Sequence, residues 1–175
     1  SRAKAVNFGI VYGIGAFSLA KDIGVSNKEA KHYIESYLAH YSGVDSYMKN
    51  VVERAKADGY VETMFGRRRN LPELTSSKHM IRAFGERVAR NMPIQGTAAD
   101  IIKIAMIKVD ERMKAENLRA RLVLQVHDEL IVEAPQDESM RVALIVQEEM
   151  ENAVKMSVPL TADAAVGRTW YDAKG

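Results

Sequence analysis

The clearest chemical signal in the sequence is a histidine followed by two carboxylates: His127, Asp128 and Glu129. The run RLVLQV before them and the run LIVEA that ends the segment have the composition of strands, so we expect the three residues at the turn of a hairpin. A tight hairpin turn normally contains glycine or asparagine, and this one contains neither. Adjacent carboxylates on a rigid turn suit Mg²⁺, which prefers oxygen ligands. An ordinary solvated turn is the alternative, and these residues alone do not decide between the two.

A second group consists of Lys4, Phe8 and Tyr12, spaced four residues apart in RAKAVNFGIVYG. On a helix this spacing places all three side chains on one face. The ammonium group can contact a phosphate, and an aromatic ring can stack on a nucleobase. The alternative is that both rings belong to the core and that only the end of Lys4 reaches solvent.

Three consecutive arginines, Arg67, Arg68 and Arg69, follow Gly66 at the tip of a second predicted hairpin. The guanidinium group is a fixed fork of donors that suits phosphate oxygens, so the cluster indicates a nucleic-acid backbone contact. A solvated run of positive charge is the alternative.

The helix after these arginines contains Arg87, Asn91 and Gln95, again spaced four residues apart. Amide side chains on a mostly apolar segment offer donors and acceptors to base edges. Equally, the amides could cap a break at Pro93, where we expect the helix to break or kink because proline has no N–H and disfavours helix at the residue before it.

Composition sets the limits on these interpretations. With 175 residues, of which 47% are hydrophobic, the chain has the size and core content of an ordinary domain. We see no 18-residue apolar run and no signal-peptide pattern, so we expect no membrane contact. The absence of cysteine excludes a disulfide framework and a thiolate metal site and fits a reducing cytoplasm. A net charge of +2 does not by itself indicate nucleic acid.

Hydrophobic periodicity and breakers predict a helix-rich α+β fold with two or three antiparallel strands. A capping box formed by Ser26 and Glu29 marks one helix start. We expect helices over residues 2–12, 17–22, 26–41, 44–58, 78–91, 95–117 and 136–155, a hairpin around 60–71, strands over 121–126 and 130–134, and a last short strand over 159–167.

Four stretches occur together and in order: RAKAVNFGIVYG, GYVETMFGRRR, ERVARNMPIQGTAADIIKIAM and LVLQVHDELIVEAP. Over essentially its whole length the chain resembles the C-terminal part of the bacterial DNA polymerase I family, family A of the DNA polymerases. The resemblance implies a partial right-hand polymerase fold. Residues 1–91 would be mostly fingers, with the small hairpin around 60–71, and residues 92–175 would be the C-terminal part of the palm, with a small antiparallel β-hairpin.

The resemblance also implies roles for the first helix. Lys4 would contact the triphosphate of the incoming nucleotide and take part in catalysis, and Phe8 would stack near its sugar and base. Phenylalanine rather than tyrosine at position 8 implies discrimination against dideoxynucleotides. Tyr12 would lie at the end of the helix, beside the templating position.

In the palm, the resemblance makes Asp128 a catalytic metal ligand and Glu129 an auxiliary catalytic carboxylate of the same metal site. His127 would lie near the primer terminus. The remaining matches are to residues that bind DNA: Arg87, Asn91 and Gln95 at the template and minor groove, and Arg67 and Arg68 at the duplex backbone.

The chain lacks one part of the family pattern. Two Mg²⁺ ions, about 3.5–4 Å apart, need carboxylates on both sides, and the family supplies one aspartate from a DYSQIELR-like strand (motif A) that has no counterpart here. The arginine that begins the nucleotide-binding helix is missing too. We therefore interpret the chain as a fragment that begins within this helix and, alone, polymerises little or not at all.

The function implied by the resemblance is DNA-directed DNA polymerisation: addition of deoxynucleotides to a primer 3′-OH, with release of pyrophosphate, in replication and repair. The implied partners are primer–template DNA, deoxynucleoside triphosphates and the N-terminal part of the polymerase, in a bacterial cytoplasm at the nucleoid. A non-catalytic nucleic-acid-binding module is the main alternative, and it would bind primer–template without Mg²⁺.

Two other enzyme classes fit less well. A metal-dependent phosphohydrolase centred on Asp128 and Glu129 would need further ligands, and none of the four histidines has ligand spacing with another. A single-subunit RNA polymerase shares the lysine and tyrosine–glycine pattern, but QGTAAD and QVHDEL fit the DNA enzyme better.

Overall fold

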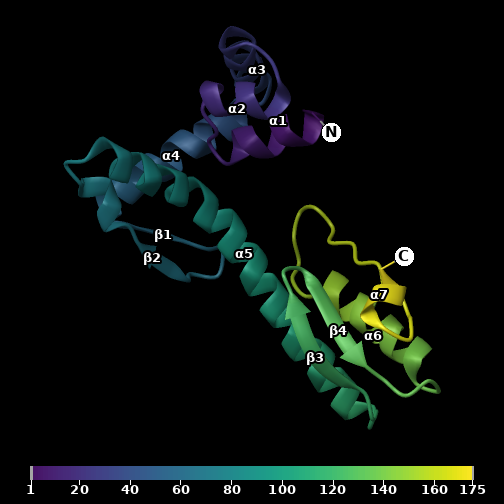
Figure 1. Cartoon of the computed structure of the whole chain (residues 1–175). Helices are drawn as coiled ribbons and strands as arrows, with labels where there is room; N and C mark the ends of the chain where they lie inside the picture. The colour runs from purple at the N-terminus through teal and green to yellow at the C-terminus, as the bar shows by residue number, and fades with distance from the viewer. Residues whose placement is uncertain (1, 175) are drawn as a thin grey trace. The chain divides into compact units, whose positions relative to one another are not determined.

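The computed structural model describes residues 2–174, except for the side chains of residues 2, 4 and 5 (Figure 1). The chain divides into two compact units, Ser1–Thr97 and Ala98–Gly175. Helices dominate, and the strands form two separate two-stranded antiparallel sheets, which confirms the helix-rich α+β class. The units meet at residue 97, and the boundary between fingers and palm at residues 91/92 stays a prediction. The assignment of the two parts to fingers and palm stays a prediction.

The elements follow one another in a simple order (Figure 1). They are α1 (Arg2–Val11), α2 (Ala16–Ile23), α3 (Asn27–His40), α4 (Ser42–Asp58), β1 (Tyr60–Glu62), β2 (Arg68–Asn70), the 3₁₀ helix η1 (Pro72–Thr75), α5 (His79–Ala115), β3 (Arg121–Val126), β4 (Glu129–Glu133), α6 (Ser139–Glu151) and α7 (Trp170–Ala173).

The first four helices lie close to their predicted ranges, and the capping box predicted at Ser26 is confirmed. Gly24 caps the end of α2 and Gly59 caps the end of α4, with φ of 70° and 77°, a region that costs glycine little. Helix α3 begins with the capping box: the Glu29 amide donates to Ser26 Oγ (3.2 Å), and the Ser26 amide donates to Glu29 Oε2 (3.0 Å). Hydrogen bonds from the Ser26 side chain and backbone lower the pKa of Glu29. Helix α4 begins at Ser42, slightly earlier than expected.

The first unit has two hydrophobic clusters. One joins α2 to α3 through Leu19, Ile23 and Ala30. The other packs α4 and the β1–β2 hairpin against α5, and its buried members are Val52, Ala55, Val61, Leu71, Leu74 and Ala89. The second cluster fixes the hairpin that carries the arginines.

Of the break or kink expected at Pro93, the break is wrong. Residues expected in two helices form the single helix α5, with Pro93 inside it. An interior proline costs about 3 kcal/mol, which the packing of residues on both sides must offset. The hydroxyl of Thr97 also donates to the Pro93 carbonyl at 2.5 Å.

The second unit is built on one apolar face of the β3–β4 hairpin. Alternate residues of the strands, Leu122, Leu130 and Val132, pack on a core shared by α5 and α6. The buried members of that core are Val109, Met113, Val142 and Ile145. An irregularity between Leu122 and Leu124 shifts the register, so that Leu124 pairs with Ile131 on the opposite face.

Charged side chains reinforce the contact between α5 and α6. The Arg112 guanidinium donates to Glu149 at 2.8 Å, and Arg141 Nε donates to Glu116 Oε2 at 2.7 Å. Hydrogen bonds from Arg141 and Arg112 lower the pKa of Glu116, and those to the carboxylates of Glu149, Glu116 and Glu148 raise the pKa of Arg112.

The prediction of a strand over residues 159–167 is also wrong, because these residues form neither helix nor strand. Pro159 has no N–H for a ladder. Helix α6 ends at Glu151, before the expected 155, and the Glu151 carboxylate accepts a hydrogen bond from the Ala162 amide at 3.1 Å. The chain thus runs from α6 to α7 as an irregular segment.

The core of the second unit gives a stability test. Ile145 is fully buried, whereas its neighbour Leu144 on α6 is 45% exposed. Ile145→Ala should lower the free energy of unfolding by about 2–5 kcal/mol, because it removes buried methyl groups and leaves a cavity. Leu144→Ala should cost less than about 1 kcal/mol. Urea unfolding of both variants checks this, and equal losses would contradict the assigned orientation of α6.

Candidate nucleotide, DNA and metal sites

The carboxylate motif forms a two-residue turn. Val126 pairs with Glu129 across the hairpin, which leaves His127 and Asp128 as the turn residues. His127 has φ of 54°, the left-handed region that a glycine would normally occupy here. Histidine is among the few residues enriched in that region. The Gln125 side-chain amide donates to the His127 carbonyl at 2.6 Å and stabilises the turn.

The three side chains of the motif differ in their surroundings. His127 and Asp128 are exposed at the tip of the turn. Glu129 begins β4, and one of its carboxylate oxygens, Oε1, lies 3.3 Å from the ammonium of Lys174. Its other oxygen, Oε2, is buried without a hydrogen-bond partner. A buried acceptor without a donor is unfavourable.

Asp128 and Glu129 fit part of a Mg²⁺ site. Magnesium is commonly held by one or two carboxylates together with waters and substrate phosphates. Among the described residues, no group of three or more histidine or acidic side chains lies close enough to hold a metal.

Phe8 on α1 and Tyr12, the residue after α1, are not among the buried core residues. Ile10 on the same helix is buried at 2% exposure, whereas Phe8 is 52% exposed and Tyr12 is half-buried. The two rings stack with centroids 6.2 Å apart and planes inclined by 26°. The exposure of Phe8 argues against a role for this ring in the core. The Lys4 side chain lies outside the described residues.

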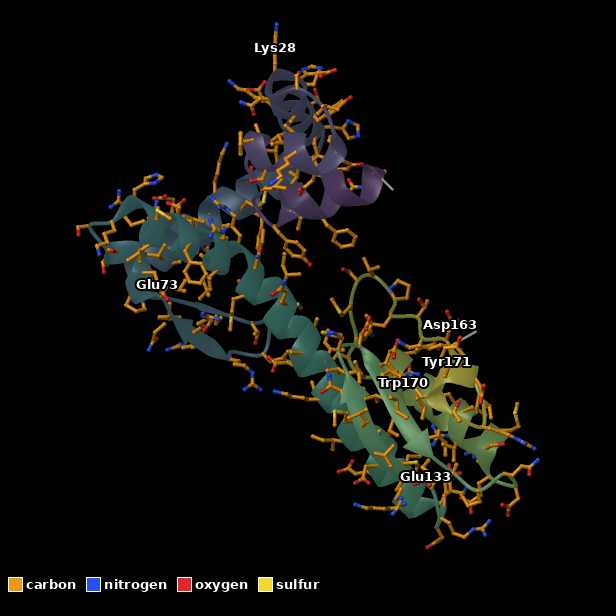
Figure 2. The ribbon with its side chains drawn as sticks, viewed as in Figure 1. Lys28, Glu73, Glu133, Asp163, Trp170 and Tyr171 are labelled. Atoms are coloured by element: carbon orange, nitrogen blue, oxygen red, sulfur yellow. The ribbon has the colours of Figure 1, made fainter. Side chains whose placement is uncertain are left out.

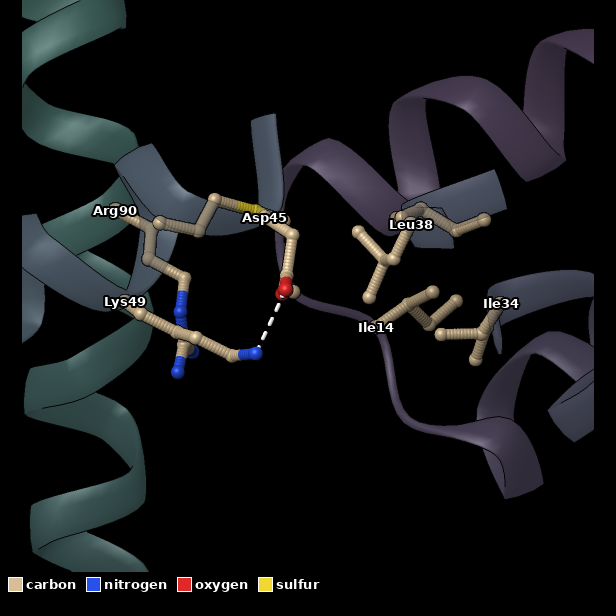
Figure 3. A pocket seen from close by; sticks show the side chains of 9 residues that line it. Ile14, Ile34, Leu38, Asp45, Lys49 and Arg90 are labelled. Atoms are coloured by element: carbon tan, nitrogen blue, oxygen red, sulfur yellow. Dashed lines mark hydrogen bonds and ion pairs between the residues drawn. The ribbon is translucent and has the colours of Figure 1, made fainter. Parts of the chain in front are cut away.

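The end of α1 packs against α5 through Gly13. Its φ is 77°, and a Cβ built there would lie 3.1 Å from the Arg90 guanidinium. A pocket of about 220 Å³ opens beside this contact, with Ile14, Ile34 and Leu38 on its apolar side (Figure 3).

The polar side of this pocket is already paired. The Lys49 ammonium lies 2.6 Å from the Asp45 carboxylate, as the dashed line in Figure 3 shows. Arg90 lies 3.6 Å from Glu86. Since these charges have partners within the chain, we assign the pocket no ligand.

The arginines of the β1–β2 hairpin do not act as one group. Arg68 Nε lies 3.1 Å from Glu62 Oε2, and the Arg68 guanidinium lies 4.4 Å from the centre of the Tyr60 ring. Arg69 pairs with the buried Val61, so it lies on the face of the hairpin that packs on α5. Arg67 is exposed near the turn. The hairpin thus separates three consecutive arginines into different environments.

Arg69 meets two of the predicted DNA-binding residues. Together with Asn91 and Gln95 it lines a pocket of about 330 Å³ in the first unit. The Asn91 side-chain oxygen is buried there without a partner, and Gln95 is exposed. Arg87, one turn before Asn91, is exposed and lies 5.8 Å from the Phe84 ring centre, outside the residues that line this pocket.

The loop before the arginines, residues 63–66, is hydrogen-bonded directly to α5. Thr63 Oγ1 accepts hydrogen bonds from the amides of Phe65 and Arg67, both at 3.2 Å. The Met64 amide donates to Thr97 Oγ1 at 3.0 Å. Gly96 permits this approach, because a Cβ there would lie only 2.7 Å from the Thr63 methyl group.

This arrangement was compared with known proteins. The model of the family described as DNA polymerase family A matches residues 1–172. The chain belongs to DNA polymerase family A. The resemblance drawn from the four sequence stretches is thereby confirmed.

Curated relatives of this family are highly similar. The chain is 56% identical over 173 residues to the DNA polymerase I of Bacillus caldotenax and 55% identical over 173 residues to that of Geobacillus stearothermophilus. These matches cover 99% of this chain and 20% of each relative, so the chain spans about a fifth of their length.

A solved structure supports the fold. The POL domain of Pol1 from M. smegmatis, in complex with DNA primer–template and dNTP, superposes with a TM-score of 0.95 at 46% identity. The match covers 99% of this chain and 31% of the other chain. The partial polymerase fold is therefore confirmed. No helix among the described residues has both the length and the apolar character needed to cross a bilayer.

The sequence selects Arg69 only as part of the arginine cluster; alternation could also have placed it on the face of Val61, because the residue opposite Val61 must share its face. The sequence does not select Lys174 at all, since 45 positions separate Lys174 from Glu129 and no motif joins them.

The turn geometry gives a second stability test. His127→Val should lower the free energy of unfolding by about 1–2 kcal/mol, because a β-branched residue is disfavoured at positive φ. His127→Asn is the matched control and should be tolerated, since asparagine adopts this conformation readily. Urea unfolding compares the two variants, and equal stability would show that the turn adopts another geometry in solution.

Proposed function

We propose that the chain is a part of a DNA-directed DNA polymerase. This part would supply the helix that binds the incoming nucleotide and the hairpin turn that carries metal-binding carboxylates. Its parent activity is the template-directed addition of a deoxynucleotide to a primer 3′-OH, with release of pyrophosphate, in replication and repair. The observation that carries this proposal is the family match over residues 1–172 combined with an intact, exposed carboxylate at Asp128 on a two-residue turn.

On α1, Lys4 is proposed to bind the triphosphate as a point charge, with Phe8 stacking near the sugar and base and Tyr12 beside the templating position. The exposed Phe8 ring, stacked with the half-buried Tyr12 ring, supports this role, because it offers an apolar face that the core of the first unit does not use.

At the turn, Asp128 and Glu129 are proposed to hold catalytic Mg²⁺ together with an aspartate supplied by the N-terminal part of the polymerase. When bound, the ions would stabilise charge on the attacking and leaving oxygens. Asp128 contributes an exposed carboxylate whose backbone the hairpin fixes, and His127 would lie near the primer terminus.

DNA binding is proposed to use both faces of the arginine hairpin and its pocket. Asn91 and Gln95 offer amide groups suited to base edges in the minor groove, and Arg87 lies on the same helix for the template strand. Arg67 and Arg68 are proposed to contact the duplex backbone, where guanidinium groups pair with phosphates. We add Arg69 to this set because it lines the same pocket as the two amides.

The proposed partners are primer–template DNA, deoxynucleoside triphosphates and the N-terminal part of the polymerase, and the proposed location is the bacterial cytoplasm, at the nucleoid. A motif A aspartate is not among the 175 residues. We therefore expect the chain to need that N-terminal part for activity.

A chimera tests the proposal. In it, this chain replaces the matching segment of the DNA polymerase I of Geobacillus stearothermophilus, which is 55% identical. The chimera should extend a primer in the presence of Mg²⁺, and the chain alone should not. Asp128→Asn should lower the rate of the chimera by at least about 10²–10³-fold, the cost typical of losing one transition-state contact.

Glu133→Gln is the matched control for this substitution. Glu133 is an exposed acid on the same hairpin, paired with Arg121 and labelled in Figure 2, and its loss should leave the rate within about twofold, as expected for an exposed pair. If the chimera binds primer–template equally well with and without Mg²⁺ and never extends it, the binding-module alternative replaces the polymerase. Robust extension by the chain alone would overturn the need for motif A.

The pocket gives a second test. Arg69→Ala in the chimera should weaken primer–template binding by about five- to tenfold, because it removes a charge beside two amides that face the DNA. Arg68→Ala should have a smaller effect, because Arg68 already pairs with Glu62 and Tyr60. Fluorescence anisotropy with a labelled duplex at several salt concentrations measures both, and the reverse order would remove Arg69 from the proposed DNA site.

A further inference from the structure

The last helix of the chain lies close to the carboxylate turn. Helix α7 is short and begins with a capping box, in which Thr169 and Asp172 exchange hydrogen bonds of 3.1 and 3.2 Å through their backbone amides. Trp170 and Tyr171, the first residues of this helix, are labelled in Figure 2. A Cβ at Gly167 would lie 2.7 Å from the Ala173 amide nitrogen, so the chain packs directly against the helix there.

This placement brings Lys174 to Glu129. The Lys174 ammonium lies 3.3 Å from Glu129 Oε1 and 4.7 Å from the centre of the Trp170 ring. A cation above an indole is attracted by the ring. Lys174 is thus held by two groups, one on its own helix and one at the start of β4.

The contact leaves neither oxygen of Glu129 available to another ligand in this conformation. Oε1 contacts Lys174, and Oε2 is buried with no hydrogen-bond partner. Asp128, one residue earlier, is exposed and carries no such contact among the hydrogen bonds and ion pairs described. The two carboxylates of one turn are therefore in different states.

We propose that Lys174 is a positioning residue for Glu129, and that Lys174 and a divalent cation are alternative partners of this carboxylate. The proposal rests on the proposed function, because it takes Glu129 as part of the metal half-site. When Lys174 is the partner, the Glu129 carboxylate points toward Lys174 at the end of α7. When the cation is the partner, the carboxylate turns toward the tip of the hairpin, and Lys174 stays over the Trp170 ring.

Two features make such an exchange physically reasonable. The Lys174 and Glu129 side chains are 53% and 45% exposed, and ion pairs this exposed are weak and screened by salt. The buried, unpartnered Oε2 is unfavourable where it lies. Rotation of the carboxylate therefore loses a weak pair and relieves an unsatisfied acceptor.

Trp170 provides a fluorescent probe of this contact. It is the single tryptophan of the chain, so tryptophan fluorescence reports on α7 alone. In the 175-residue chain, addition of MgCl₂ at constant ionic strength should change Trp170 emission in a saturable way. The change should be lost in Lys174→Ala and in Glu129→Gln.

Lys114→Ala is the matched control. Lys114 forms an exposed ion pair of 2.6 Å with Asp110 in the same unit, and its loss should leave the fluorescence response intact. Circular dichroism confirms that every variant keeps its helical content. A Trp170 signal that ignores Mg²⁺, or responds equally in Lys174→Ala, would overturn the proposal.

Primer extension by the chimera gives an independent readout. Lys174→Ala should lower the Mg²⁺ concentration for half-maximal rate by about two- to fivefold, the size expected from removing one exposed competitor. Lys174→Arg should restore the original value, because it keeps the charge. Gly167→Ala, which displaces α7 without changing Lys174, should shift the value in the same direction as Lys174→Ala.

An unchanged or increased Mg²⁺ requirement in Lys174→Ala would overturn the proposal. So would a lower rate at saturating Mg²⁺ with no shift in the requirement, because that pattern indicates a purely structural role. If the unaltered chimera does not extend primers, the proposed function fails. The fluorescence experiment still decides whether Mg²⁺ replaces Lys174 as the partner of Glu129. The two failures are therefore distinguishable.

Discussion

The carboxylate turn depends on one backbone angle, the φ of 54° at His127. A two-residue hairpin turn requires a positive φ, and here an imidazole-bearing residue adopts it instead of glycine. Because the turn is this short, Asp128 follows β3 and precedes β4 with no flexible loop on either side. The apolar face of the same hairpin is packed on α5 and α6, so the core of the second unit fixes the position of the carboxylates. The backbone strain at His127 thus accompanies a short turn that fixes the positions of Asp128 and Glu129.

In the first unit, the register of the β1–β2 hairpin, rather than an unusual backbone φ, determines where the arginine side chains lie. The pairing of Val61 with Arg69 sends one arginine toward α5, and the pairing of Glu62 with Arg68 gives the next arginine a partner on the other face. Three identical residues in a row therefore acquire separate environments. On α5, the spacing of four residues brings Asn91 and Gln95 to the same pocket as Arg69.

Much of this could be predicted from the sequence, because local signals and tertiary packing agree over most of the chain. The capping box at Ser26 acts within one turn of helix, and it was predicted correctly. Pro93 was misjudged because packing on both sides of α5 overrides its local cost.

The failures at the chain's end have a different cause. Residues 159–167 have the composition of a strand but form none. The contact between Lys174 and Glu129 is invisible in the sequence, because it depends on the irregular path of the chain after α6. The family resemblance supplied the roles of the motif residues, and no local pattern could have supplied that contact.

The close approach at Gly96 has a mechanical consequence. The Thr63 methyl group occupies the space that any larger residue at position 96 would need, and the Met64–Thr97 hydrogen bond lies beside it. A rotation of this part of α5 about its own axis would drive the side of the helix into the threonine and stretch that bond. The hairpin and this stretch of helix should therefore rotate together, so that a rotation of the helix also moves the arginines of the hairpin.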